Sequence, residues 1–506
     1  MKHMKRIFAL ALAIVMAMSL ATVAFAAEGD KTYSITITAP EGASLTNHTY
    51  AVYQIFTGEL STNEAGKTVL SNVKYGQNYG TLGEEVPESV LTALAGMSGA
   101  AAAEDLNGKK TGTAYATLPD GNSWTVTAPA GYYLIVDTST NLPQGETSSA
   151  FILQLVEDVE VKSKHSAGPK VEKKIDDTND STEATNEIEW HDSADHDIGD
   201  AIPFKLEMTV PGNFAQFVEY GEAYKFVFHD KEEQGLTFNN DAKVYVDGTL
   251  ITSGYTVVTS PEDGDTFDVV FADLTKVTGV KVGSVISVVY TSTLNQSAIL
   301  GSQGNVNKVY GEYSNLHRPE YPGRTPDDTV IAFTYKVIVN KVDEKGEALE
   351  GAKFTLEKYD AATGKWVAIS QVETEPGTVF TFKGLDDGKY RLTETETPAG
   401  YNTIKPIEFT VTADHDILWE TQGRTDVLNS LTGDAATGEV ESGEKEITFT
   451  PSASEGSLTT KVENKSGTVL PETGGMGTTI FYTLGGIMVL AAVVLLVTKK
   501  RMASAE

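Results

Sequence analysis

The sequence predicts a mostly β protein built from three tandem β-sandwich domains. The first observation is the period-two alternation of apolar and polar residues in segments such as 33–38, 336–340 and 408–411, the pattern of strands with one buried face. The second is the punctuation of these short segments by turn dipeptides such as Asp247-Gly248 and Asp387-Gly388. The third is length: about 445 residues lie between two terminal apolar segments, enough for three domains of ordinary size.

The two terminal segments are expected to be processing signals. Basic residues precede the apolar run 7–25, and Ala-Phe-Ala at 24–26 is a typical cleavage site, so residues 1–27 are predicted to be a secretory signal peptide. Near the other end, residues 478–497 are almost uncharged and, as a helix, would span the roughly 30 Å of a bilayer core. The basic cluster 499–501 behind them would stay on the cytoplasmic side.

Composition excludes several classes of function. The net charge of −31 and the pI near 4.6 argue against a nucleic-acid partner, which would need a basic face. Cysteine is absent, so neither disulfides nor thiol chemistry can operate. No Ser/His/Asp or paired-carboxylate pattern stands out, and we expect neither an enzyme nor a cofactor.

Domain boundaries are placed at shifts in composition. They divide the chain into a signal peptide 1–27, a first domain 28–163, a second domain 169–328, a third domain 330–466 and a C-terminal segment 470–506. A polar joint, 162–169, precedes the second domain, and the Pro-rich stretch 318–326 is predicted to form a stiff link before the third. The main helical pattern lies at 87–97, and the alanines at 100–103 can extend it.

Directly before the apolar C-terminal segment stands Leu470-Pro471-Glu472-Thr473-Gly474, which Pro471 keeps extended. In sequence and context it resembles the LPXTG cell-wall sorting signal of Gram-positive surface proteins. In that family a sortase cysteine attacks the Thr–Gly bond, here Thr473–Gly474, and passes the threonine carboxyl group to an amine. The resemblance implies a secreted chain attached covalently to the cell wall, with only transient membrane anchoring.

The third domain carries the most specific internal motif. Residues 390–401, YRLTETETPAGY, resemble the YxLxETxxPxGY box of collagen-adhesin B-type (CnaB-like) domains. In that family a lysine of the first strand and an asparagine of the last form a spontaneous isopeptide bond, assisted by the box glutamate. The resemblance implies a bond between Lys341 and Asn464, with Glu394 as the assisting acid.

The residues support that assignment independently. Lys341 is in phase with Val337 and Val339, so its side chain should point into the core. Burial favours the neutral amine, which is nucleophilic, and the protonated form of a carboxyl group, which can donate a hydrogen bond to the amide carbonyl. The alternative interpretation is a solvated Lys–Glu ion pair beside an unrelated asparagine.

Segments 169–175, 226–230 and 304–315 of the second domain resemble the corresponding domain of sortase-assembled backbone pilins. Those domains carry a collagen-adhesin A-type (CnaA-like) Lys–Asn bond helped by an acidic residue. Lys173 is in phase with its apolar neighbours on alternate positions and is therefore preferred over Lys174. The resemblance implies three Ig-like sandwiches of CnaA and CnaB type.

The assisting acid of this domain is expected to be Asp230. Three asparagines compete for the bond, and we favour Asn315 over Asn305 and Asn307 because it ends the last strand. In the first domain, residues 130–136 resemble a strand of pilin N-terminal domains but carry no carboxylate in the box position, so no cross-linking triad is assigned there and the question stays open.

Backbone pilins supply a polymerising amine from a VxVxPK-like motif after their first domain. The match is at 159–164, which puts Lys164 in the nucleophile position, with Lys162 as the alternative. Ser163 replaces the usual proline and Lys162 the usual aromatic residue, a departure that leaves the choice between the two lysines open. Both lysines could also simply solvate the joint.

No metal site is expected. Residues 176–187 have some EF-hand spacing, but Ser181 stands where the loop needs glycine. Residues 191–197 are interpreted as a solvated polar loop, with metal binding by their histidines and aspartates as the alternative, and residues 137–141 fall short of a DxSxS metal-dependent adhesion motif. The last point favours a shaft subunit over a tip adhesin.

The resemblance as a whole implies the shaft subunit of a covalent pilus, joined head to tail from the Thr473 carboxyl group to the Lys164 amine. The partners it implies are other copies of the chain, pilin-specific and housekeeping sortases, peptidoglycan, and in addition minor or tip pilins and a host surface. The alternative is a monomeric, sortase-anchored cell-wall adhesin that binds host matrix.

Overall fold

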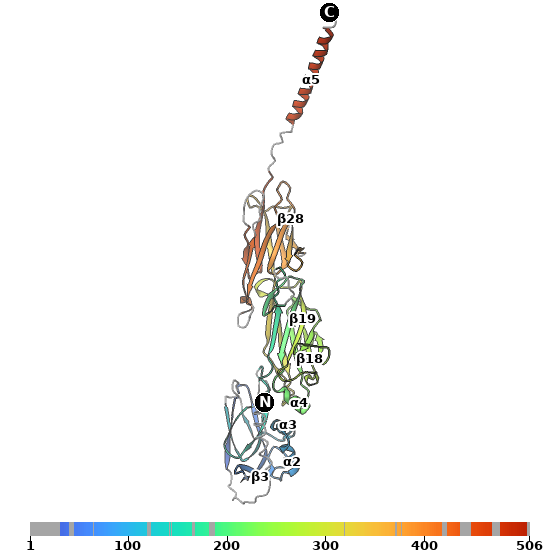
Figure 1. Cartoon of the computed structure of the whole chain (residues 1–506). Coiled ribbons are helices and arrows are strands. Elements are labelled where there is room, and N and C mark those ends of the chain that lie inside the picture. The colour runs from blue at the N-terminus through green and yellow to red at the C-terminus, as the bar shows by residue number, and fades with distance from the viewer. Residues whose placement is uncertain are drawn as a thin grey trace.

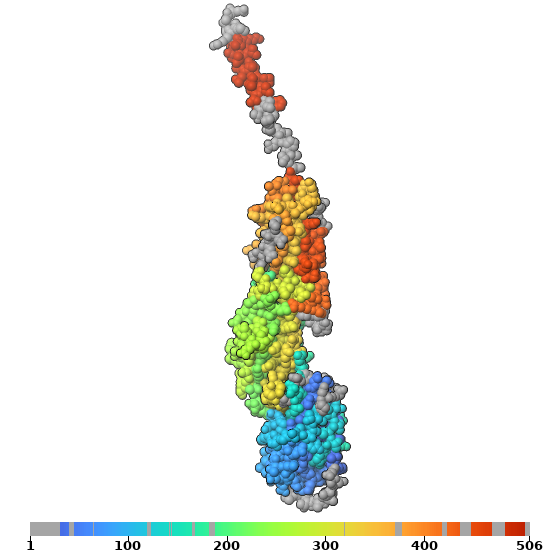
Figure 2. Space-filling model, turned by 180° about the vertical axis from the view of Figure 1, so that it is seen from behind, coloured from blue at the N-terminus to red at the C-terminus, as the bar shows by residue number. Residues whose placement is uncertain are grey.

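The computed structural model describes residues 31–467 and 476–502, apart from residues 40–44, 64, 119–122, 141, 143, 164–166, 182–187, 318, 370–371, 376, 417–422 and 436–446. Three β-sandwiches follow one another along a rod, and a single helix stands at the far end (Figure 1). The space-filling view from behind shows the three bodies in end-to-end contact (Figure 2). The predicted mostly β, multi-sandwich fold is confirmed. The predicted signal peptide and the pentapeptide 470–474 lie outside the described residues.

The first sandwich packs the sheet β5-β1-β8 against the sheet β3-β2-β6-β7, with β4 beside β2. Two helices, α2 and α3, cover the other face of the larger sheet, and Ser98 caps α3 by accepting a hydrogen bond from Ala101. The helical prediction at 87–97 is therefore confirmed, with a break after α2. The elements are β1 Thr32–Thr38, β2 Tyr50–Thr62, β3 Thr68–Tyr75, α2 Glu88–Ala95, α3 Gly99–Lys109, β4 Ala116–Leu118, β5 Ser123–Pro129, β6 Gly131–Asp137, β7 Ala150–Leu155 and β8 Val159–Lys162.

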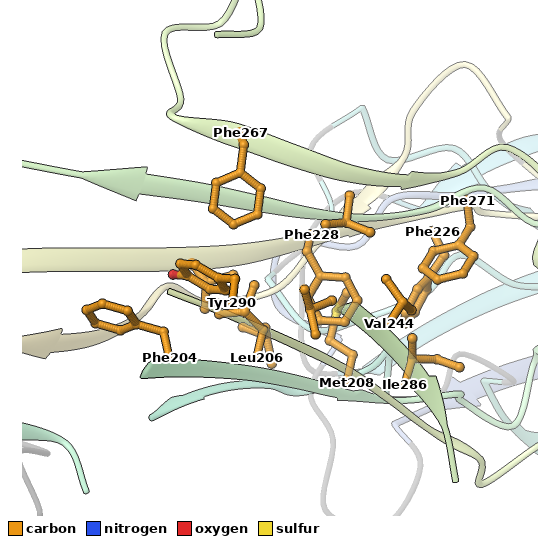
Figure 3. Packing of buried hydrophobic residues seen from close by; sticks show 14 of the residues in the cluster. Phe204, Leu206, Met208, Phe226, Phe228, Val244, Phe267, Phe271, Ile286 and Tyr290 are labelled. Atoms are coloured by element: carbon orange, nitrogen blue, oxygen red, sulfur yellow. The ribbon is translucent and has the colours of Figure 1, made fainter. Parts of the chain in front are cut away.

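The second sandwich faces the sheet β10-β9-β12-β19-β15-β16 with the sheet β11-β22-β20-β13-β18-β17. Strands β12 and β19 alternate strictly between buried and partly exposed residues, and aromatic rings fill the space between the sheets (Figure 3). The elements are β9 Val171–Asp176, β10 Trp190–His191, β11 Ser193–Asp195, β12 Ala201–Thr209, α4 Phe214–Tyr220, β13 Phe226–Glu232, β14 Leu236–Phe238, β15 Lys243–Val246, β16 Thr249–Ile251, β17 Thr256–Thr259, β18 Phe267–Phe271, η1 Leu274–Lys276, β19 Val285–Leu294, η2 Gly301–Gln303, β20 Asn305–Tyr313, β21 Gly323–Arg324 and β22 Asp328–Phe333.

The third sandwich consists of the sheets β26-β27-β23-β32-β31 and β25-β24-β28-β29-β30. Its first and last strands, β23 and β32, lie side by side and parallel. The elements are β23 Tyr335–Asp343, β24 Lys353–Asp360, β25 Lys365–Ala368, β26 Val372–Glu375, β27 Val379–Leu385, β28 Gly388–Glu396, β29 Ile407–His415, η3 Arg424–Asp426, β30 Leu428–Ala435, β31 Thr450–Ser452 and β32 Ser457–Asn464. The cores of all three sandwiches are complete by Val462, without the final helix.

Two sequence interpretations of the second sandwich are corrected. The Pro-rich stretch 318–326 is not the link to the third domain, because β21 pairs with β20 and β22 then adds a strand between β20 and β11. The chain passes into the third sandwich only at Thr334, between β22 and β23. Residues 193–195, read as part of a solvated loop, form the buried strand β11 because they pair in parallel with β22.

The C-terminal helix α5, Met476–Met502, contains the predicted membrane segment. Its stretch Phe481–Lys500 has a mean hydropathy of 2.3 and is not buried against the sandwiches, so by length and composition it can cross a bilayer.

Candidate functional site

A buried lysine, an asparagine and a glutamate meet in the third sandwich. The parallel register of β23 and β32 sets Lys341 opposite Val462 and Asp343 opposite Asn464, while Glu394 comes from β28 in the facing sheet. The Asn464 amide donates to both Glu394 carboxylate oxygens, at 3.0 and 3.1 Å. None of the three side chains has more than a few per cent exposure. The structure thus brings together all three residues that the sequence predicted for this site.

The surroundings of this cluster favour a nucleophilic amine. Desolvation lowers the pKa of Lys341 to about 8, although the nearby Glu394 and Glu463 carboxylates raise it. The Lys341 Nζ donates a hydrogen bond to the Val462 carbonyl oxygen at 2.9 Å. Among the described residues, Asn464 Oδ1 has no hydrogen-bond partner. Turning the amide exchanges Oδ1 with Nδ2 and directs the carbonyl oxygen at the Glu394 carboxyl group.

A second cluster lies between the sheets of the second sandwich. Lys173 reaches across from β9, and its Nζ hydrogen-bonds to the Asp230 carboxylate of β13 and, at 2.8 Å, to the Tyr290 hydroxyl of β19. Tyr290 donates to Asp230 at 2.9 Å and accepts from the Asn307 amide at 2.9 Å. Each of these side chains is essentially inaccessible to solvent.

Burial drives the lysine and the aspartate of this cluster toward their neutral forms. Desolvation lowers the pKa of Lys173 and raises the pKa of Asp230, in each case against the attraction of the partner's charge. Within the described part of the chain, Asp230 Oδ1 and Asn307 Oδ1 have no hydrogen-bond partner. A lysine, an aspartate and an asparagine amide whose carbonyl oxygen has no described partner therefore share one buried site.

The predicted Asn315 is not in this cluster, which is a correction to the sequence prediction. Its amide donates to the Tyr321 carbonyl oxygen at 2.8 Å and its Oδ1 accepts from the Ser148 amide of the first sandwich at 3.2 Å. The physical reason is register: β20 ends at Tyr313, and Asn315 lies beyond the strand, at the joint with the first sandwich. Asn307 lies in the cluster in place of Asn315. It stands in β20 two positions before Val309, which pairs with Asp230 of β13.

Tyr290 was not anticipated. Its hydroxyl contacts all three other members of the cluster, and its ring stacks on Phe204 with centroids 5.4 Å apart. The available signal was its phase in the alternating strand β19, which places it inward, but nothing in the sequence placed that strand in the same sheet as β9, with β12 between them.

The residues predicted for sortase chemistry are only partly visible. Lys164 and the pentapeptide ending at Gly474 lie outside the described residues. Lys162, the alternative donor, is exposed and ends β8, where it pairs with Thr38.

The second and third sandwiches are held together by ion pairs across their joint. The Arg424 guanidinium makes two hydrogen bonds to Glu233, at 2.7 and 2.6 Å, and one to the Gly304 carbonyl oxygen. Lys358 lies buried between carboxylates of both sandwiches, at 2.8 Å from Asp197 and 2.7 Å from Asp386. These contacts couple the two bodies at two separate points.

Comparison with known proteins agrees with this arrangement of sandwich domains and a C-terminal anchor. Residues 335–424 match the family described as SpaA, prealbumin-like fold domain, and residues 462–504 match the LPXTG cell wall anchor motif. The chain is similar to the trypsin-resistant surface T6 protein of Streptococcus pyogenes serotype M6, with 23% identity over 435 residues and 73% of each chain covered.

Solved structures of similar fold include the T6 backbone pilin of S. pyogenes, with a TM-score of 0.53, 19% identity and 87% of this chain and 99% of that chain covered. The full-length major pilin SpaD of Corynebacterium diphtheriae has a TM-score of 0.52 and 18% identity, with 86% and 98% covered. An LPXTG anchor implies processing by a sortase and attachment to the cell wall, and the apolar α5 fits transient membrane anchoring. The chain is therefore an LPXTG cell-wall-anchored surface protein with the three-domain fold of the backbone pilins.

Proposed function

We propose that this chain is the shaft subunit of a covalently polymerised surface pilus, strengthened by one intramolecular isopeptide bond in each of its second and third sandwiches. The bonds join Lys173 to Asn307 and Lys341 to Asn464. The observation that carries the proposal is the recurrence of one arrangement, a buried lysine, asparagine and acid, in two successive sandwiches of a chain that ends in a cell-wall anchor.

The chemistry of each bond follows from its site. The neutral lysine amine attacks the asparagine side-chain carbonyl carbon, and the acid protonates the carbonyl oxygen as charge develops there. The acid then shuttles a proton from the attacking nitrogen to the departing amide nitrogen. A secondary amide forms, the carbon–nitrogen bond of the side-chain amide breaks, and ammonia leaves. The fold supplies proximity, so no further catalyst is required.

The positions of the two bonds suit a molecule that bears tension. In the third sandwich, Lys341 and Asn464 lie at the C-terminal ends of β23 and β32, so tension applied to the C-terminus passes directly into β23. Residues 342–463 then carry no load. In the second sandwich, a Lys173–Asn307 bond removes residues 174–306 from the load path in the same way.

Between copies, a sortase would hold one chain as a thioester at Thr473, and the Lys164 amine of the next chain would release it as an amide. Lys162 is the alternative donor. Because the donor and the acceptor lie at different places on the chain, repetition gives an open, head-to-tail polymer. A housekeeping sortase would finally transfer the polymer to peptidoglycan, and minor pilins and host surfaces are the remaining expected partners.

Two measurements test the proposal separately. Intact mass spectrometry of residues 28–473 should give a mass about 34 Da below that of the plain composition, since each bond expels one ammonia of about 17 Da. In the native bacterium, wall extracts should contain a ladder of polymers that disappears when Lys164 and Lys162 are both replaced by alanine. A ladder that survives this double replacement would overturn the assigned donors, and wall extracts holding only single-copy product would support the monomeric adhesin instead.

A further inference from the structure

The outer face of the second sandwich carries a cluster of one histidine and three aspartates that the isopeptide sites do not use. His229 lies on β13, Asp268 lies directly opposite it on β18, and Asp263 and Asp265 lie in the connection between β17 and β18. One ligand atom from each of these four residues lies within 4.8 Å of all the others. We propose that this cluster, formed by His229, Asp263, Asp265 and Asp268, binds a divalent transition-metal ion.

The distances agree with a metal polyhedron. His229 Nδ1 lies 3.0 Å from Asp268 Oδ1, 3.4 Å from Asp263 Oδ2 and 3.6 Å from Asp265 Oδ2. Four ligands at bond lengths of 2.0–2.2 Å around a tetrahedral ion are separated by roughly 3.3–3.6 Å. The three oxygens therefore already surround Nδ1 at about the spacing that a shared ion would impose.

His229 is the observation that distinguishes this cluster from an ordinary acidic patch. Its side chain is 9% exposed, and neither ring nitrogen forms a hydrogen bond with any residue that the structure describes. The contacts from Nδ1 to the carboxylates are short but lack hydrogen-bond geometry, and Asp268 Oδ1 is likewise without a hydrogen-bond partner. A buried polar group in this condition is costly unless something else binds it.

The remaining contacts orient the ligands. The imidazole stacks on Tyr310, with centroids 4.4 Å apart and planes 7° from parallel, and the Tyr310 hydroxyl donates to Asp265 at 3.3 Å. The Asp265 amide donates to Asp263 Oδ1 at 3.2 Å, which leaves the other carboxylate oxygen, Oδ2, facing His229. Such outer contacts are typical of residues that hold a metal.

The charge of the site also calls for a cation. Three carboxylates converge, and two of them, Asp265 and Asp268, are at most one-tenth exposed. Lys231 approaches Asp265 at 3.9 Å, but its side chain is more than half exposed and offsets little of this charge. One imidazole with three carboxylates favours Zn²⁺ or Mn²⁺ over the all-oxygen ions Ca²⁺ and Mg²⁺.

A metal there would fasten the β17–β18 connection to the strand that carries Asp230. Because successive side chains of a strand point to opposite faces, His229 points to the outer face of the sheet and its neighbour Asp230 points inward to the Lys173 cluster. The proposal is independent of the isopeptide bonds. The sequence predicted no metal because His229 is separated from the three aspartates by more than thirty positions, and only the pairing of β13 with β18 brings them together.

The test is calorimetric titration of metal-free residues 28–473 with Zn²⁺, Mn²⁺, Ca²⁺ and Mg²⁺ in separate runs. We expect one equivalent of Zn²⁺ or Mn²⁺ to bind, and binding to weaken by at least about tenfold in His229→Gln and in Asp263→Asn, since even the loss of an outer-shell contact costs that much. Substitution by Co²⁺ should give the visible absorption of a tetrahedral site if four protein ligands complete it.

Glu262→Gln is the matched control, because it removes the same charge from the same turn at an exposed residue outside the cluster. Asp263 is itself 42% exposed, so its replacement should leave the fold intact, which near-UV circular dichroism in chelator verifies. Equal weakening in Glu262→Gln and Asp263→Asn, stoichiometric binding of only Ca²⁺ or Mg²⁺, or no binding at all would each overturn the proposal.

Discussion

Replacing Asn307 by alanine, with Asn315→Ala as its matched control, tests the proposed bond of the second sandwich. Asn307→Ala removes the amide that shares the buried site with Lys173, so the bond cannot form. Asn315→Ala removes an equally buried amide whose partners are Ser148 and Tyr321, remote from that site. The two substitutions are chemically identical and differ only in place.

The expected size of the effect follows from the loop that the bond closes. Lys173 and Asn307 enclose about 135 residues, for which the loss of unfolded-state entropy is worth about 5 kcal/mol by analogy with a disulfide. For a domain of this size that corresponds to a fall in melting temperature of about 10–20 °C. Asn315→Ala loses two hydrogen bonds at a joint and should cost about 1–3 kcal/mol.

Intact mass and scanning calorimetry of residues 28–473 give the decisive readings. Relative to its own composition, Asn307→Ala should show a deficit of about 17 Da, from the third sandwich alone, while Asn315→Ala keeps the full deficit of about 34 Da. If Asn307→Ala retains the full deficit while Asn315→Ala loses half, the sequence-based choice of Asn315 was right and the geometric argument fails.

Three further predictions concern the third sandwich and its joint. In Asn464→Ala, Lys341 stays a free amine whose pKa is about 8 in the folded chain and 10.5 in the unfolded chain. Between these pH values the unfolded chain binds more protons than the folded chain. The free energy of unfolding should therefore rise with pH across that window by up to about 3 kcal/mol. Urea titrations at several pH values measure this, and the rise should vanish when Lys341→Met is added. Under force, Asn464→Ala should release about 40 nm of chain as residues 342–463 unfold, at about 3.4 Å per residue, whereas the unmodified sandwich should not extend; an equal extension in both would refute the load path. At the joint, Lys358→Met strands buried carboxylates and should cost about 3–5 kcal/mol, while Arg424→Ala breaks a partly exposed pair with Glu233 and should cost about 1 kcal/mol in the same urea assay; equal losses would contradict the role of burial.

Strand periodicity was enough to predict that Lys173 and Lys341 are buried. Lys173 and Lys341 share the phase of their apolar neighbours, and a side chain in that phase must enter the core of a sandwich whichever strands face it. The residues of the third site could be chosen from sequence because Glu394 lies in the recognisable box 390–401 and Asn464 ends the last strand of the domain.

The same reasoning could not choose the asparagine of the second sandwich. Asn305 and Asn307 both lie in β20 and both are buried, so their phase does not separate them from each other. What separates them is the antiparallel register of β20 against β13, which sets Asn307 opposite Glu232, where its amide reaches the Tyr290 hydroxyl that also donates to Asp230. Register between strands about 75 residues apart is a tertiary property. Because strand pairing could not be predicted from the sequence, Tyr290 was also missed. The proposed metal cluster was missed for the same reason, since only the pairing of β13 with β18 assembles its ligands.

The proposed polymer also explains why the first sandwich differs from the other two. Its described buried polar side chains include histidine, serine and aspartate but no lysine, so this part of the chain offers no buried amine for a cross-link. If Lys164 accepts the neighbouring subunit, tension enters the chain after the first sandwich and leaves at Thr473, through the second and third sandwiches only. The first sandwich then lies outside the load path and needs no covalent cross-link. A donor amine mapped by mass spectrometry of linked peptides to a residue before β8 would place that sandwich under load and would contradict this account.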